Sequence, residues 1–179
     1  MTDSYNKYFD FCPQCGIEQF LFYRGRKYFK CCDCGYEFYF NMAASVVAII
    51  RNDKNEVLFT IRRHDPAKGM LDLPGGFVDP GETAEAAIVR EIKEELNLDV
   101  CEYRYIMSSP NEYPYGGFNY HTLDLVFECT VSDQENIAVA DDVSGYRFIN
   151  LREVNADEIG LESIRNIIAY LSEPEKPEQ

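Results

Sequence analysis

Three glutamates near the middle of the chain have a spacing that suits the binding of metal ions. Glu91, Glu94 and Glu95 lie within the stretch 75–98, and Arg90 immediately precedes them. At about 100° per residue, the three carboxylates share one broad face of a helix. Like charges in this arrangement repel each other, and partial burial makes the repulsion costlier. Mg²⁺ prefers oxygen ligands and binds through a few carboxylates, waters and substrate phosphates, so it would relieve this repulsion.

An acidic helix face exposed to solvent is the simpler reading of this cluster, but its surroundings favour a functional site. Two glycine turns, Gly75-Gly76 and Pro80-Gly81, precede the cluster, and Glu82 directly follows the second turn. Thr83 suits the N-cap of a helix over residues 83–96. The apolar stripe of this helix recurs every four residues, at Ala84, Ile88, Ile92 and Leu96. The pattern predicts a helix that holds the glutamates next to glycine turns.

The N-terminal part of the chain carries two pairs of cysteines with the spacing of a zinc site. The pairs are Cys12 with Cys15 and Cys31 with Cys34, each with two residues between the thiols. Four thiolates make a closed tetrahedral site, which is typical of structural Zn²⁺. The segment between the pairs suits a hairpin tipped by Gly25, so we expect a zinc ribbon. The alternative, a set of buried and metal-free cysteines, leaves about forty residues with few aliphatic side chains to stabilise them.

The composition changes near residue 41, where aliphatic and β-branched runs replace cysteines and aromatics. We therefore expect three parts: the zinc ribbon over residues 1–40, an α/β domain over 41–172 and a disordered tail over 173–179. The expected strands cover residues 45–51, 56–63, 100–107, 120–131 and 146–149, and a second helix is expected over residues 159–171. Turn residues at 52–55 predict that the first two strands form a hairpin.

Overall composition restricts the classes of partner. The 179 residues are 46% hydrophobic and 27% charged, which is typical of globular proteins, and the formal net charge is -14. Such a charge disfavours nucleic acid and anionic membranes, which need a positive field. The longest apolar run, residues 42–50, is too short to cross a bilayer, and the N-terminus lacks a signal-peptide pattern. We therefore expect no membrane partner and a cytoplasmic location, where cysteines stay reduced.

From Gly76 onward the chain resembles the Nudix hydrolases, whose signature is G-x5-E-x7-R-E-U-x-E-E-x-G-U with U an aliphatic residue. Gly76, Glu82 and the run 90–95 match its defined positions, and only Asn97 departs, where the signature has glycine. Asn is the next best residue for a left-handed helix cap, so this departure leaves the chemistry intact. The resemblance covers roughly residues 43–171. It implies an α/β/α sandwich with a mixed β-sheet, preceded here by the ribbon.

The resemblance also implies an activity, which is metal-dependent hydrolysis of a diphosphate linked to another group, with Mg²⁺ or Mn²⁺ as the catalytic ion. The residues that it assigns to catalysis and metal binding are Gly76 (through its carbonyl), Glu82, Arg90, Glu91, Glu94 and Glu95. Arg90 would orient the glutamates that hold the metal. Many family members supply one more acidic ligand from a later loop, and Asp141 or Asp142 stands at about that place. An exposed loop turn explains this pair equally well.

The implied substrate is a nucleoside diphosphate linked to another moiety, such as ADP-ribose, a nucleotide sugar or a dinucleotide. A ribbon ahead of a Nudix domain resembles the bacterial NADH pyrophosphatases, whose downstream motif S-Q-P-W-P-F-P-x-S matches residues 108–116 only in part. NADH pyrophosphatase activity, giving NMNH and AMP, is therefore the alternative. We expect Tyr113 or Tyr115 to stack on a base, whereas Phe118 and Tyr120 are read as strand residues that pack.

A reading from another class is a binding module, in which the Nudix fold senses a nucleotide and the ribbon contacts a partner. The complete metal set argues against a pure sensor. Two arginines at the end of the second expected strand, Arg62 and Arg63, are read as surface residues rather than phosphate contacts. Homodimers are common in the family, so a homodimer is an expectation here.

Overall fold

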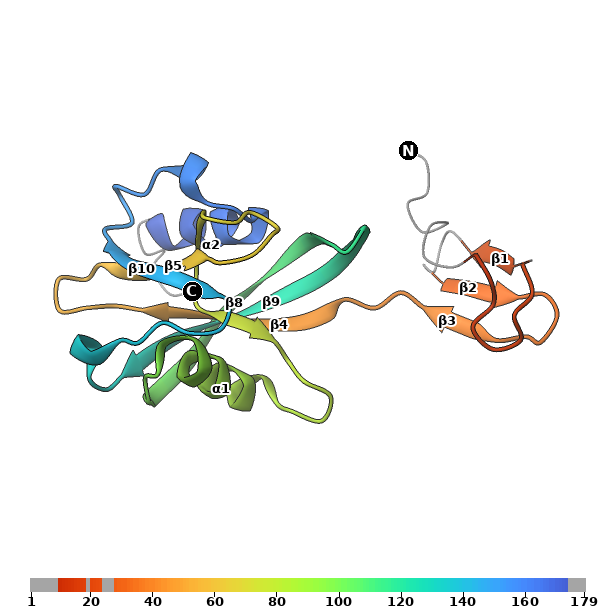
Figure 1. Ribbon diagram of the computed structural model, residues 1–179, viewed down its shortest axis with the longest axis horizontal. Coiled ribbons are helices and arrows are strands. Elements are labelled where there is room, and N and C mark those ends of the chain that lie inside the picture. Colours follow the sequence, from red (N-terminus) through yellow and green to blue (C-terminus); the bar gives the residue numbers. More distant parts are fainter. Residues whose placement is uncertain (1–9, 19, 24–27, 174–179) are drawn as a thin grey trace, which may run out of the picture. The chain divides into compact units, whose positions relative to one another are not determined.

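The computed structural model describes residues 10–18, 20–23 and 28–173 (Figure 1). It divides into two compact units, Met1–Met42 and Ala43–Gln179, which are described separately. The predicted ribbon tip at Gly25 and nearly all of the predicted tail, residues 174–179, lie outside the described residues. None of the helices in the described ranges is long and apolar enough to span a membrane.

The first unit is a three-stranded antiparallel sheet with two cysteine turns. Its strands are β1 (Phe20–Tyr23), β2 (Tyr28–Cys31) and β3 (Glu37–Tyr39), in the order β1-β2-β3. Phe29 is fully buried, and its ring stacks on Phe38 with a centroid distance of 5.7 Å. A few aromatic contacts of this kind make a small core, so a metal is the expected source of further stability.

Over residues 43–173, the second unit contains two sheets, two α-helices and two short 3-10 helices. The four-stranded sheet has the order β7-β4-β9-β8, and the three-stranded sheet has the order β10-β5-β6. The elements in chain order are β4 (Ala43–Ile50), β5 (Val57–Arg62), β6 (Leu71–Asp72), β7 (Gly75–Phe77), α1 (Ala84–Leu96), β8 (Val100–Tyr115), β9 (Phe118–Val131), η2 (Gln134–Asn136), β10 (Val143–Ile149), η3 (Ala156–Glu158) and α2 (Glu162–Ser172). Strands β4 and β9 run parallel and all other pairs are antiparallel.

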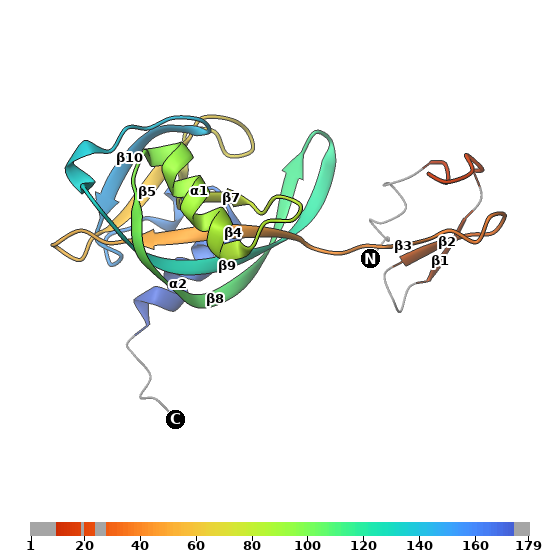
Figure 2. The same ribbon diagram turned by 90° about the horizontal axis from the view of Figure 1, so that it is seen from below.

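The strands form a layer between the two helices. Figures 1 and 2 show α1 and α2 on opposite sides of the strands. Two buried clusters correspond to the two faces: Ile88 and Ile92 of α1 pack in one cluster, and Ile164 and Ile167 of α2 pack in the other. This arrangement, with its parallel β4–β9 pair in an otherwise antiparallel sheet, confirms the predicted α/β/α sandwich with a mixed sheet.

Strand β4 is buried on both faces because it contributes to both clusters. Val46 and Ala48 belong to the α1 side, whereas Val47 and Ile49 belong to the α2 side. Such a strand reads as a continuous apolar run rather than an alternating one. Its run from residue 45 to residue 50 is buried throughout.

The predicted hairpin between the first two strands of this unit is wrong. Strands β4 and β5 belong to different sheets and share only an isolated bridge between Arg51 and Val57. The predicted turn is present, because Asn55 N–H donates to the Asn52 carbonyl at 2.9 Å. The chain reverses there, but β9 pairs with one edge of β4 along its whole length and β7 pairs with residues 45–47 on the other edge. Strand β5 pairs instead with β10 and β6.

Strands β8 and β9 form a hairpin longer than the sequence predicts. Residues 108–115, which precede the turn at Gly116, form the distal part of β8 and pair with β9 along their whole length. The free end of this hairpin extends beyond the rest of the sheet (Figures 1 and 2). Helix α1 begins and ends as predicted: the Thr83 hydroxyl accepts the Ala86 N–H at 3.2 Å, and Asn97 takes the left-handed conformation with φ of 57°.

Candidate active site

Strand β7 and helix α1 meet closely at the two glycines. The Gly75 N–H donates to Glu95 Oε2 at 3.0 Å. Gly75 has φ of 146°, and a Cβ built there would overlap the Val46 carbonyl oxygen of β4. A Cβ on Gly76 would lie 2.5 Å from Glu91 Oε1. Glycine is therefore required at both positions for the Glu91 and Glu95 carboxylates to lie against β7.

Arg90 holds three of the predicted carboxylates together. Its Nε and Nη2 donate to Glu82 at 2.9 and 2.8 Å, and its Nη1 donates to Glu91 at 2.8 Å and to Glu94 at 3.0 Å. Nη2 also donates to the Phe77 carbonyl at 3.0 Å. The hydrogen bonds that Arg90 donates to Glu82, Glu91 and Glu94 raise the pKa of Arg90, and the same guanidinium lowers the pKa of Glu82. A planar guanidinium with five donors suits this role, which an ammonium cannot reproduce.

Two of the glutamates are buried, and burial changes how readily they ionise. Desolvation raises the pKa of Glu91, although the contact with Arg90 opposes the shift. Burial raises the pKa of Glu95 well above 4.5, and the nearby charges of Glu91, Asp72 and Asp142 add to the shift. Glu94 is half exposed. The negative charge of the carboxylates at this site is therefore larger than the positive charge of Arg90 can balance.

The loop before β10 brings both candidate aspartates toward the glutamates. Asp141 takes the left-handed conformation with φ of 49°, and its charge raises the pKa of Glu91. Asp142 acts in the same way on Glu95 and lines the cavity described below. Both aspartates thus lie near enough to the glutamates to act on their charge, and either remains a candidate for the additional ligand.

The oxygen donors around Glu91 and Glu95 suit Mg²⁺ or Mn²⁺. These donors are the Glu91 and Glu95 carboxylates, which have raised pKa values and lie against the two glycines of β7. Mg²⁺ needs only one or two carboxylates besides waters and substrate phosphates. Among the described residues, only the four cysteines place three or more potential ligand atoms within 4.8 Å of one another. The carboxylates of Glu91 and Glu94 instead form ion pairs with Arg90. The donor set therefore fits a metal that is shared with a phosphate substrate.

A cavity of about 130 Å³ opens between the two sheets beside these groups. Gly76, Glu95 and Asp142 border it on the side of the glutamates, and Phe77 and Tyr113 provide aromatic walls. The rings of Phe77 and Tyr113 meet edge to face at 6.1 Å. The structure thus places Tyr113, one of the two predicted stacking residues, at the cavity. Tyr115 is 59% exposed near the hairpin turn and does not line the cavity.

Several polar groups in the cavity are not predicted from the sequence. Arg62, read from the sequence as a surface residue, lines the cavity and binds Asp72 Oδ2 through Nη1 at 2.5 Å and Tyr113 Oη through Nη2 at 2.9 Å. The other missed residues are Ser45, Thr60, Asn111, Thr122 and Asp124. Their only signal in the sequence is a polar side chain at a strand position where an aliphatic one is expected. Such breaks in the hydrophobic pattern are typical of functional sites.

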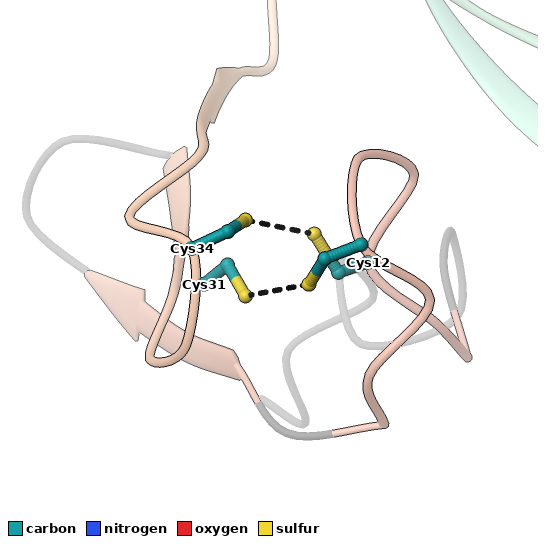
Figure 3. A group of neighbouring side chains, drawn as sticks. Cys12, Cys31 and Cys34 are labelled. Carbon is teal, nitrogen blue, oxygen red and sulfur yellow. Dashed lines mark hydrogen bonds between the residues drawn. The ribbon is translucent and has the colours of Figure 1, made fainter.

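The first unit contains a separate cluster, formed by the four predicted cysteines. Cys12 Sγ lies 3.7 Å from Cys34 Sγ, and Cys15 Sγ lies 3.6 Å from Cys31 Sγ (Figure 3). All four sulfurs lie within 4.8 Å of one another. Zn–S bonds of about 2.3 Å place tetrahedral sulfur ligands roughly 3.8 Å apart, so the spacing fits zinc.

Comparison with known proteins decides the family. A profile of the NUDIX domain matches residues 41–171 of the chain. The chain belongs to the Nudix family. This confirms the resemblance seen in the run from Gly76 to Asn97, and the N-terminal cysteine cluster is consistent with the ribbon that was expected ahead of the Nudix domain.

Named relatives include two kinds of Nudix hydrolase. The ADP-ribose pyrophosphatase of Methanocaldococcus jannaschii is 39% identical over 121 residues, which are 66% of this chain and 68% of that protein. The NAD-capped RNA hydrolase NudC of Vibrio atlanticus is 36% identical over 104 residues, which are 58% of this chain and 38% of that protein. The chain therefore spans about two thirds of the first relative and well under half of the second.

The solved structures agree on the fold. The MutT NUDIX hydrolase from Burkholderia pseudomallei superimposes with a TM-score of 0.64 at 21% identity, covering 74% of this chain and 99% of that one. At this identity the likeness concerns the fold alone, and it agrees with the layered arrangement of α1, the sheets and α2.

Proposed function

We propose that this Nudix protein is a metal-dependent pyrophosphohydrolase that cleaves a nucleoside diphosphate linked to another moiety, with ADP-ribose as the first candidate. The observation that carries the proposal is the position of Glu95, a buried carboxylate that borders the cavity next to Gly76 and the Arg90-bound glutamates. The similarity to an archaeal ADP-ribose pyrophosphatase supports this choice of substrate.

In this proposal Glu91, Glu94 and Glu95, the Gly76 carbonyl and either Asp141 or Asp142 hold Mg²⁺ or Mn²⁺. The bound ion would neutralise pyrophosphate oxygens and lower the pKa of a bound water. Arg90 and Glu82 keep the glutamates in position. In the overall reaction, water oxygen bonds to one phosphorus, the bridging P–O bond breaks, and the water protons pass to the products and solvent. ADP-ribose would give AMP and ribose 5-phosphate.

The test is a turnover screen with Mg²⁺ and Mn²⁺, in which products are identified by mass. The substrates are ADP-ribose, NADH, NAD⁺, nucleotide sugars, dinucleoside polyphosphates and nucleoside triphosphates. Release of AMP and ribose 5-phosphate from ADP-ribose is the expected result. Nucleotide binding without turnover of any substrate would favour the sensing module instead.

A second candidate is hydrolysis of NADH or of an NAD-capped RNA. The relative named NAD-capped RNA hydrolase supports it, and so does the cysteine cluster ahead of the Nudix domain. The net charge of -14 disfavours the RNA form of this substrate unless the ions supply the positive field. Formation of NMNH and AMP from NADH, at a higher kcat/KM than the cleavage of ADP-ribose, would favour this candidate.

Three further assignments complete the proposal. Zn²⁺ bound by Cys12, Cys15, Cys31 and Cys34 would have a structural role, because four thiolates leave no open position for a substrate. A homodimer, measurable by light scattering, is expected. A cytoplasmic location is expected as well, and cell fractionation tests it.

A further inference from the structure

The side chains on the inward face of the β8–β9 hairpin change from apolar to polar toward the hairpin turn. Val126 of β9 and Met107 of β8 are paired and pack in the α2-side core. Side chains on this face recur at every second residue, so the next inward positions are the pairs Ser109–Asp124 and Asn111–Thr122. These four polar side chains occupy positions where the strand pattern would place aliphatic ones.

All four of these side chains are removed from water. Ser109, Asn111, Thr122 and Asp124 are 3%, 7%, 2% and 5% exposed. Burial of polar groups is unfavourable unless they are hydrogen-bonded. The hydrogen bonds of this group therefore show which atoms are satisfied by the protein and which remain available.

Hydrogen bonds within the protein use only some of the polar atoms of these four side chains. Asp124 accepts from the Ser45 hydroxyl at 2.5 Å and from the Thr122 hydroxyl at 3.5 Å, and both bonds reach Oδ1. Within the described ranges, Oδ2 of Asp124 and the side-chain amide of Asn111 have no hydrogen-bond partner. Asp72, the other buried aspartate of the cavity, is already bound by Arg62. Of the four residues, Asn111 and Asp124 are therefore the ones that combine polar atoms without a partner in the described part of the chain with a position in the lining of the cavity.

The two residues are diagonal neighbours on one face of an antiparallel pair, which places their Cβ atoms about 7 Å apart or slightly less. A carboxylate oxygen accepts, and an amide both accepts and donates. We propose, on the basis of the proposed hydrolase function, that Asn111 and Asp124 form a subsite for a ring with two adjacent hydrogen-bond donors. The cis-diol of the terminal ribose of a nucleoside diphosphate ribose has this chemistry, and so does the N1–H and amino edge of guanine.

Position and size favour the ribose. The cavity borders Gly76 and Glu95, so a ribose on Asn111 and Asp124 would direct its phosphate toward the proposed metal site. The volume of about 130 Å³ is close to that of an engineered cavity of about 150 Å³ that holds one benzene ring. One ring fits this space better than a complete purine. Asn111 and Asp124 would then determine which sugar is accepted on the phosphate distal to the nucleoside.

Binding of small fragments tests the subsite independently of turnover. The full chain is titrated calorimetrically, with Mg²⁺ present, with ribose 5-phosphate, 2-deoxyribose 5-phosphate, GMP and AMP. We expect ribose 5-phosphate to bind, and its deoxy analogue to bind at least about 10-fold more weakly because one donor is lost. Asp124→Asn and Asn111→Leu should each weaken ribose 5-phosphate binding by a similar factor. Glu112→Gln, on the outward face of the same hairpin, should leave binding unchanged.

The outcomes distinguish ribose from guanine as the ligand of the subsite, and they distinguish the subsite proposal from the hydrolase proposal. Tight GMP binding that depends on Asp124, without ribose 5-phosphate binding, supports the subsite and assigns it to guanine. Equal binding of ribose and deoxyribose phosphates, no binding of any fragment, or wild-type affinity in both folded variants overturns it. Thermal unfolding shows whether each variant folds. If Asp124→Asn does not fold, Asn111→Leu still tests the subsite. Fragment binding in a protein that hydrolyses no substrate would contradict the hydrolase proposal and leave the subsite standing.

Discussion

Gly76 and Glu91 lie in direct contact, so that any side chain on the glycine would meet the carboxylate. A Cβ at Gly76 would be 2.5 Å from Oε1 and 2.7 Å from Oε2 of Glu91. Contacts this short require the carboxylate to move, because a real Cβ does not approach another atom so closely. The packing of β7 against α1 therefore determines where one of the proposed metal-binding carboxylates lies.

Gly76→Ala should lower kcat by roughly 10- to 100-fold, since a displacement of about 1 Å in a catalytic group has effects of this size. The apparent affinity for Mg²⁺ should fall as well. Gly145→Ala is the matched control, because its Cβ would meet only the end of the Ile61 side chain at 3.3 Å. Steady-state kinetics over a range of Mg²⁺ concentrations measures both effects. Equal activity in the two variants would contradict the proposed role of Glu91.

Glu95→Gln should keep the fold and remove most turnover, by roughly 10²- to 10⁴-fold in kcat. The change retains the size of the side chain, and its amide oxygen can still accept the Gly75 N–H. Circular dichroism and the turnover assay on the best substrate check the two parts of this prediction. Wild-type turnover in the folded variant would refute the assignment of this residue.

The same variant should change the pH dependence of stability. Burial holds the pKa of Glu95 in the folded protein well above 4.5, so the unfolded chain loses this proton at lower pH than the folded one. The contribution of Glu95 to stability is therefore present below about pH 4.5 and is lost as pH rises through the folded pKa, by about 1.4 kcal/mol for every tenfold difference between the acid constants of the two states. In metal-free protein at pH 7, Glu95→Gln should raise Tm, whereas at pH 4 the two proteins should differ little. Thermal unfolding in EDTA measures this, and a lower Tm for the variant at pH 7 would contradict the sign.

Arg90→Lys should reduce kcat by about 10- to 100-fold, as is usual when a residue that positions metal ligands is lost. Lysine keeps the charge, but it cannot donate to Glu82, Glu91, Glu94 and the Phe77 carbonyl at once. Arg104→Lys is the control, because Arg104 is exposed and its one side-chain partner among the described residues is Glu128 on β9. Both variants are compared by kinetics and by Mg²⁺ titration. A similar loss in the control would indicate a general effect of replacing arginine.

Metal analysis of the purified chain should find one zinc ion, and Cys12→Ser should lose most of it. Replacing one of four thiolates weakens the site, and the binding free energy of structural zinc contributes directly to folding. Cys32→Ser is the matched control, since Cys32 lies beside the cluster but is exposed and outside it. Zinc stoichiometry by mass spectrometry and protease resistance of the N-terminal unit provide the readouts. Full zinc content in the Cys12 variant would show that the cysteines have another role.

Local features of this protein were predictable because they depend on nearby residues. Thr83 caps α1, and Asn97 ends it in the left-handed conformation, as the helix signals indicate. Each cysteine pair forms a tight turn with its own backbone, because Gly16 N–H donates to the Cys12 carbonyl and Gly35 N–H donates to the Cys31 carbonyl. The pairing of β4 was not predictable in this way. Its neighbours β7 and β9 follow later in the chain, and strands of this composition suit many partners.

The family, the helix that carries Glu91, Glu94 and Glu95, and the cysteine turns could all be predicted from the order of the residues. These features rest on residue type and short spacing, which do not change when the chain folds. Only the folded chain shows that Arg62 lies at a cavity and that Asn111 and Asp124 share one inward face of a long hairpin. Those relationships join strands distant in the chain, and their register follows from packing against the α2-side core. A single polar residue in a strand gives no indication of its partner until that register is set.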